Sequence, residues 1–237
     1  VLSAAYGQQS AASAELIRRD PDNRLLARGP RRRLSAETVR DQALFASGLL
    51  KERVGGPSVK PYQPEGLWKE IATDTEYVQS HGDDLYRRSL YTYWKRTVAP
   101  PTMMVFDAAG REACIVQRST TNTPLQALAL MNDTTFIEAA RVLAARIVAR
   151  PEMSDEQRVW EVFRSVLLRQ PREDEARVLL RRLVKSRERY KVAPESARRL
   201  ISTGEFPVDS KLDVVEWAAL TSVGSLVLNL DETVTKE

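Results

Sequence analysis

The stretch that decides the fold is DTTFIEAARVLAARIV, residues 133–148. Its apolar residues recur at spacings of three and four, which is the pattern of a helix with one buried face. Asp133 is placed to cap the first turn, and Pro151 stops the helix soon after its end. We therefore predict a long helix that lies against a core through Phe136, Ile137, Ala140, Leu143, Ala144, Ile147 and Val148.

Further helices are predicted on both sides of this stretch. Downstream, Ser154 and Gln157 form a capping-box pattern before an apolar face of Val159, Trp160, Phe163, Val166 and Leu167. Three more helices are expected at about 173–190, 195–201 and 213–228. Upstream, Ser35 starts one helix, and a second capping box, Thr123 with Gln126, starts a short helix that ends at Asn132.

The middle of the chain carries weaker signals. Residues 54–66 are rich in proline and glycine and predict an ordered loop. Residues 83–98 favour a helix, although their aromatic alternation also suits a strand. Residues 101–122 contain two short apolar runs, MMVF and ACIV, and any small hairpin is expected there, with Cys114 in the core.

The fold class is therefore mainly α: an irregular multi-helix domain with long ordered loops and at most one small β-hairpin. Residues 1–33 form a polar N-terminal segment, interpreted as the end of a preceding region, because the chain opens on Val1 without a signal-peptide pattern. Residues 34–237 form the helical domain, with a subdivision near 118–122 as an alternative.

Composition excludes several classes of site. A single cysteine, Cys114, and a single histidine, His81, allow no internal disulfide, no Cys/His zinc cage and no CxxCH haem attachment. We expect no metal and no cofactor in this chain. The net charge of +4 is too small for a dedicated nucleic-acid binder, and no apolar run is long enough to span a bilayer.

Two segments are candidate binding sites. Around 86–96, arginines and a lysine alternate with aromatic rings, a mixture that pairs with anions and stacks on sugars or bases, but that is also typical of a core face with long cationic neighbours. Around 118–133, polar residues surround a short helix, where capping accounts for most of them. The binding candidates are Arg87, Arg88, Tyr91, Trp94, Lys95, Arg96, Asn122 and Gln126.

Carboxylates suggest a hydrolase as an alternative. Asp107 follows the MMVF run, and Asp231 and Glu232 lie near the end of the chain. Two acids about 5–10 Å apart can hydrolyse a glycoside, but sequence spacing does not bring these three together. No G-x-S-x-G, Walker A or dinucleotide motif is present.

Five stretches carry a family resemblance: DPDNRLLARGPRRRLSAETVRDQAL, GGPSVKPYQPEGLW, YRRSLYTYWKRTVAPPTMMVFDA, RSTTNTPLQALALMND and NLDETVTKE. Together they resemble the planctomycete-specific domain of unknown function that follows planctomycete cytochrome C-type domains. The resemblance implies an exported or periplasmic multidomain bacterial protein, with haem c carried by a preceding domain.

The leading hypothesis is a non-catalytic helical module that serves assembly or ligand binding beside a cytochrome-c-type domain. Its partners would be other domains of the same polypeptide, a polysaccharide or an envelope protein. The alternatives are a hydrolase acting on a carbohydrate polymer and a nucleic-acid-binding module that uses the arginine clusters, among them Arg31, Arg32 and Arg33. Nucleic acid is the least favoured of these partners.

Overall fold

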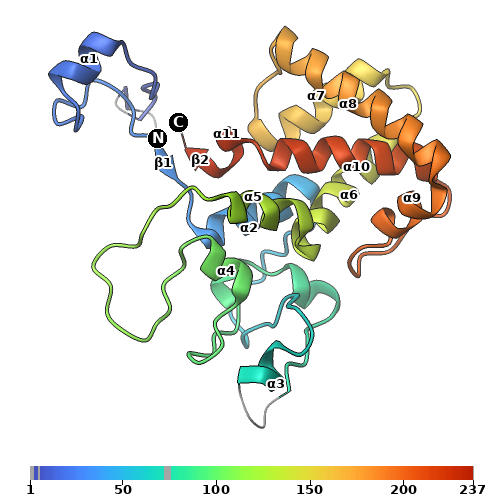
Figure 1. The fold of residues 1–237 in the computed structure, drawn as a ribbon, viewed down its shortest axis with the longest axis horizontal. Coiled ribbons are helices and arrows are strands. Elements are labelled where there is room, and N and C mark those ends of the chain that lie inside the picture. The colour runs from blue at the N-terminus through green and yellow to red at the C-terminus, as the bar shows by residue number, and fades with distance from the viewer. Residues whose placement is uncertain (1–2, 5, 72–75, 237) are drawn as a thin grey trace.

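Two helices that are buried along most of their length form the centre of the protein. The computed structural model describes residues 3–4, 6–71 and 76–236. In it, α6 (Thr134–Val148) packs along α10 (Val214–Leu228), as Figure 1 shows. Helix α10 is apolar on every side, which is typical of a helix that other elements surround. Its residues Trp217, Ala218, Ala219, Leu220 and Val223 are at most 1% exposed.

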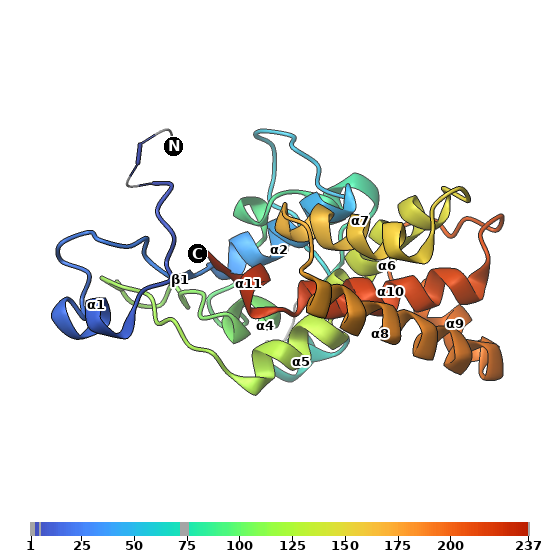
Figure 2. The same ribbon diagram turned by 90° about the horizontal axis from the view of Figure 1, so that it is seen from above.

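Four further helices complete the bundle around this pair. They are α2 (Ala36–Ser47), α7 (Asp155–Leu167), α8 (Glu173–Val192) and α9 (Pro194–Ile201). Each packs one apolar face inward, and α8 and α9 lie on the outside of α10 (Figure 2). The main core takes residues from both sides of 118–122, including Val39 and Phe106 before it and Phe136 and Trp217 after it.

The predicted helix starts are confirmed by their capping bonds. Side-chain oxygens at the N-cap positions accept backbone N–H groups at the start of α2, α5 (Pro124–Asn132), α6, α7 and α10. The capping residues are Ser35, Thr123, Asp133, Ser154 and Asp213. The short helix expected in the polar N-terminal segment is α1 (Ala14–Arg19), which stands away from the bundle in Figures 1 and 2 and has no buried residue.

The helix predicted over 83–98 is wrong. This segment contains two 3₁₀ turns, η1 (Gly82–Tyr86) and η2 (Ser89–Tyr91), and the chain is extended at Arg87 and Arg88 between them. Arg87 and Thr92 form parallel bridges with Lys51 and Val59. The backbone groups are therefore paired with the 51–59 loop instead of with one another along a helix. Helix α3 (Leu67–Ile71) follows that loop.

The extended chain predicted over 101–122 is also wrong. Pro100 and Pro101 end the preceding element, but Pro101 then opens a helix, α4 (Pro101–Val105), because proline is well suited to a first helical turn. The following segment has no strand, and Cys114 is exposed instead of buried, since residues 111–122 lie on the surface. Here hydrophobicity alone misled the prediction.

The two-stranded antiparallel sheet joins distant parts of the chain. It pairs β1 (Arg32–Arg33) with β2 (Thr235–Lys236), which follows α11 (Asp231–Val234). In the described residues this is the only sheet, so the mainly helical class is confirmed, while the hairpin location is not. No helix in the described part of the chain is both long and apolar enough to cross a membrane.

Three inward-facing assignments need correction. Trp160 is 44% exposed and Val184 is 45% exposed, although the three-and-four pattern placed both inward. Conversely, Glu138 and Arg141 on α6 are completely buried.

Candidate functional site

A chain of hydrogen bonds connects several of the predicted site residues near the two-stranded sheet. Thr121 donates through its backbone N and its Oγ1 to the carboxylate of Asp107, at 2.7–3.0 Å. The Gln126 amide donates to Thr121 Oγ1 at 3.1 Å and accepts from Arg33 Nη2 at 2.8 Å. Arg33 Nη1 in turn donates to Asp231 at 3.2 Å. Asp107 and Asp231, far apart in sequence, thus belong to one polar network.

The network is a structural tie as well as a candidate site. Gln126 is 1% exposed, and its amide also donates to the carbonyl oxygen of Val105, at the end of α4. Its side chain therefore does not complete the predicted capping box with Thr123, which accepts only the Gln126 backbone N at 3.4 Å. Asp107 adopts a left-handed backbone conformation with φ 59°, which turns the chain out of α4. Asn122 is exposed beside these residues.

The two acids near the chain end face different partners. Asp231 pairs with Arg31 and Arg33, which accounts for two of the three clustered arginines. Glu232 binds Arg169 through both oxygens, at 2.6 and 2.7 Å. Glu232 borders a cavity of about 420 Å³, but Arg169 already holds its carboxylate. Neighbouring positions in sequence thus belong to two separate ion-pair networks.

Arg87 organises the 51–59 loop. It is 1% exposed and donates to the carbonyl oxygens of Pro57 at 2.8 Å and Arg53 at 3.1 Å, and also to that of Gly55. Its guanidinium lies 3.8 Å from the centre of the Tyr91 ring. The positive charge is consequently directed at backbone carbonyls of the same chain.

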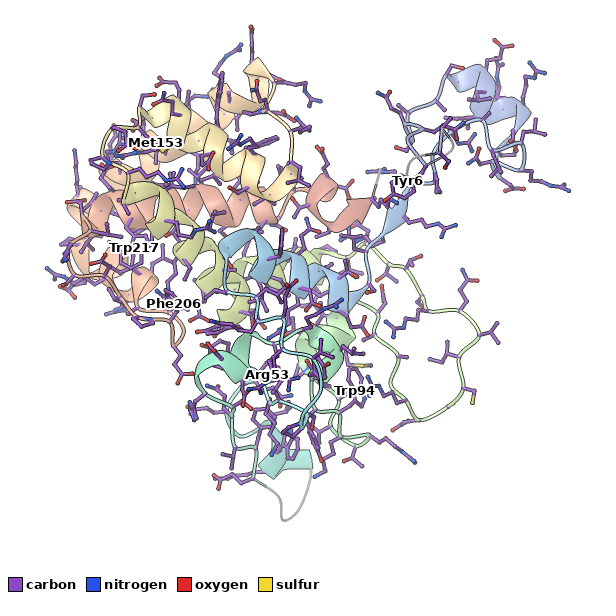
Figure 3. The ribbon with its side chains drawn as sticks, turned by 180° about the vertical axis from the view of Figure 1, so that it is seen from behind. Tyr6, Arg53, Trp94, Met153, Phe206 and Trp217 are labelled. Carbon is purple, nitrogen blue, oxygen red and sulfur yellow. The ribbon has the colours of Figure 1, made fainter. Side chains whose placement is uncertain are left out.

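The other candidates of this segment lie closer to the surface. Arg88 is exposed, 3.7 Å from Asp41, and Arg96 is exposed as well. Trp94 is half-buried against the core, and its Nε1 donates to the carbonyl oxygen of Gly110 at 3.3 Å. Figure 3 shows Trp94 and Arg53 in the same lobe below the helical bundle.

An aromatic cluster forms a small second packing centre in this lobe. Trp68 is 4% exposed and contacts Tyr77 and Tyr93, with ring centroids 5.1 and 6.0 Å apart. The ammonium groups of Lys60 and Lys95 lie over the Trp68 ring, at 5.7 and 4.5 Å. The rings are stacked mostly on one another and on lysine side chains, an arrangement that also stabilises the lobe.

A buried ionic cluster was not predicted. Glu138 Oε1 accepts from Tyr86 Oη at 3.0 Å, from Phe206 N at 2.7 Å and from Arg141 Nη2 at 3.4 Å. Arg141 also donates to the carbonyl oxygens of Thr203 and Phe206, both at 2.5 Å. The cluster therefore attaches the 203–206 loop to α6 and to η1.

Burial sets the electrostatics of this cluster. Removal from water lowers the pKa of the Arg141 guanidinium, and burial together with the Glu138 carboxylate raises the pKa of Tyr86. Gly204 passes so close that an added Cβ would lie 2.3 Å from the Glu138 carboxylate. Tyr86 and Phe206 also line a cavity of about 360 Å³ at the surface, next to the exposed His81–Glu205 pair at 2.9 Å.

A signal for this cluster was available in the sequence. Residues 136–144 are apolar at every position except 138 and 141, so a helix over them has no broad polar face. Two charges separated by three residues on such a helix are expected to be buried and to require partners. The partners themselves, Tyr86 and the 203–206 loop, are distant in sequence.

Taken together, the fold and these networks define a mainly helical domain without a recognisable catalytic constellation among the described residues. No curated protein and no solved structure matches the chain. The model of one family, PSD1, described as a protein of unknown function (DUF1553), matches residues 1–183. The chain belongs to this family.

Proposed function

We propose that this chain is a non-catalytic helical module of a multidomain protein, serving assembly or ligand binding. The main support is the state of its candidate catalytic carboxylates. Asp107 accepts bonds from Thr121 through both oxygens, Asp231 pairs with Arg31 and Arg33, and Glu232 binds Arg169. These acids hold elements together, which a structural role explains fully.

The proposal includes the setting implied by the family resemblance: an exported or periplasmic bacterial protein with a cytochrome-c-type domain. Haem c attached through CxxCH needs two cysteines and an adjacent histidine. This chain has only Cys114, which is exposed, and His81, which pairs with Glu205. Its residues do not fit a haem c site, so any haem would belong to another domain.

Turnover measurements on the full protein test the absence of catalysis. We expect no hydrolysis of neutral or acidic polysaccharides above a buffer blank, by reducing-end assay. The matched variants are Asp107→Asn, which changes the network, and Asp22→Asn, which changes an exposed acid in the N-terminal segment. Hydrolysis that persists in Asp22→Asn but disappears in Asp107→Asn would overturn the proposal.

One observation supports the alternative of a carbohydrate-polymer hydrolase. The structure joins Asp107 to the 118–126 segment through Thr121, and Trp94 binds Gly110 in the loop between them. Acid, amide and aromatic groups in one region are the usual elements of a sugar site. The same turnover experiment decides between the two functions.

A further inference from the structure

Helix α8 presents two different faces. Leu179, Leu183 and Tyr190 are buried against the bundle, since each is at most 7% exposed. The opposite face is solvent-exposed and carries six cationic side chains. These are Arg177, Arg181, Arg182, Lys185, Arg189 and Lys191.

Four of these cations follow one another at intervals of four residues, and we call them the cationic row: Arg177, Arg181, Lys185 and Arg189. At a rise of 1.5 Å per residue, successive members are about 6 Å apart along the helix and the row is about 18 Å long. Like charges spaced by four residues destabilise a helix. The row therefore works against the stability of the helix that carries it.

Within the residues that the structure describes, no carboxylate forms an ion pair with the cationic row. The contrast with Arg187 on the same helix is direct, because Arg187 binds Asp155 at 2.8 Å and Glu216 at 2.5 Å. Arg169, just before α8, likewise binds Glu175 and Glu232. The fold supplies acids to neighbouring arginines and supplies none to the row.

We propose that the cationic row is a docking surface for an acidic helix of a partner protein. A helix with Glu or Asp at every fourth position repeats its charges at the same interval of about 6 Å. Arginine pairs with carboxylates in a planar, two-bond geometry and is enriched in protein interfaces. The inference rests on the proposed assembly role and names the partner class.

The other side chains of this face favour a protein over other polyanions. Val178, Val184 and Val192 are 49%, 45% and 88% exposed beside the cations, and they give the face apolar contact area. Aromatic side chains that stack on bases, or that anchor a helix in a bilayer, are not exposed on α8. Single-stranded nucleic acid and anionic membranes are therefore the competing occupants to be tested.

The probe is a labelled 20-residue helical peptide with Glu at every fourth position, measured by fluorescence anisotropy with the full chain at low salt. The test variant replaces all four residues of the row by Gln. The control variant replaces Arg18, Arg19, Arg24 and Arg96, all exposed, by Gln, which gives the same change in net charge. A second peptide has the same composition with its Glu residues contiguous.

We expect the row variant to weaken binding of the spaced peptide by about tenfold or more, while the control variant changes it by less than about threefold. The row variant should fold at least as stably as the parent, because the like-charge pairs are gone. Equal binding of both peptides, or no binding at low salt, would overturn the proposal. So would tighter binding of anionic vesicles or single-stranded DNA through the same row. Because none of these readouts measures turnover, they are independent of the test of catalysis.

Discussion

Single residues in the buried cluster carry large consequences for stability. Glu138→Leu leaves the Arg141 cation buried without a carboxylate, so we expect the free energy of unfolding to decrease by about 3–5 kcal/mol. The double variant Glu138→Leu with Arg141→Met should recover much of this loss. Urea denaturation followed by circular dichroism measures both. A loss below about 1 kcal/mol, as for the surface control Glu161→Ala, would contradict the prediction.

A second residue-scale prediction concerns acid. The hydrogen bond from Arg169 lowers the pKa of Glu175 from 4.5 to about 2. A carboxylate with a lowered pKa stabilises the folded state fully above its unfolded-state pKa. The contribution of Glu175 should therefore be lost as the pH falls from about 4.5 to about 2.

We expect Glu175→Gln to be less stable than the parent at pH 6 and to approach it in stability at pH 2.5, by urea denaturation at both values. The matched control is Glu173→Gln, an exposed acid of the same helix turn, for which the gap should stay small and constant. An unchanged gap in Glu175→Gln between the two pH values would show that Arg169 does not hold this carboxylate.

At the scale of elements, the start of α6 is a point of dependence. Asp133 accepts the backbone N of Thr135 at 2.8 Å, and it also accepts the hydroxyl of Thr102 in α4 at 2.5 Å. Asp133→Ala removes the cap and this link, so we expect a loss of about 1–2 kcal/mol, measured by thermal unfolding. Asp133→Asn should restore part of it, because asparagine also caps. Equal losses in both variants would argue against capping as the cause.

Elements were predictable from the sequence where local signals agreed. The starts of α2, α5, α6, α7 and α10 follow from caps and helical periodicity, which act within one turn. The segment at 83–98 was not predictable in this way, because Arg87 pairs with carbonyl oxygens more than 30 residues away in sequence. The same reason explains the site: Asp107, Gln126 and Asp231 could be named, but the Arg33 side chain that joins two of them could not.

For the whole molecule, the exposed segment 111–122 gives a test of how the chain is held together. It lies on the surface without helix or strand, so trypsin should cut after Arg111 or Arg118 before it cuts within the helices. We expect the two products to elute together in size-exclusion chromatography, because Val39 and Phe106 share a core with Phe136 and Trp217. Separation of the products without denaturant would show that each part folds alone.

The pairing of β1 with β2 has a mechanical consequence. Arg32 faces Lys236 and Arg33 faces Thr235, so the two strands run in opposite directions and the chain leaves both of them on the same side. Tension applied between residues 31 and 236 would open this sheet one bond at a time, in the manner of a zipper. Only afterwards would the load reach α11 and the buried α10. The two-stranded sheet would therefore yield first and at low force, while the helical bundle behind it stays closed.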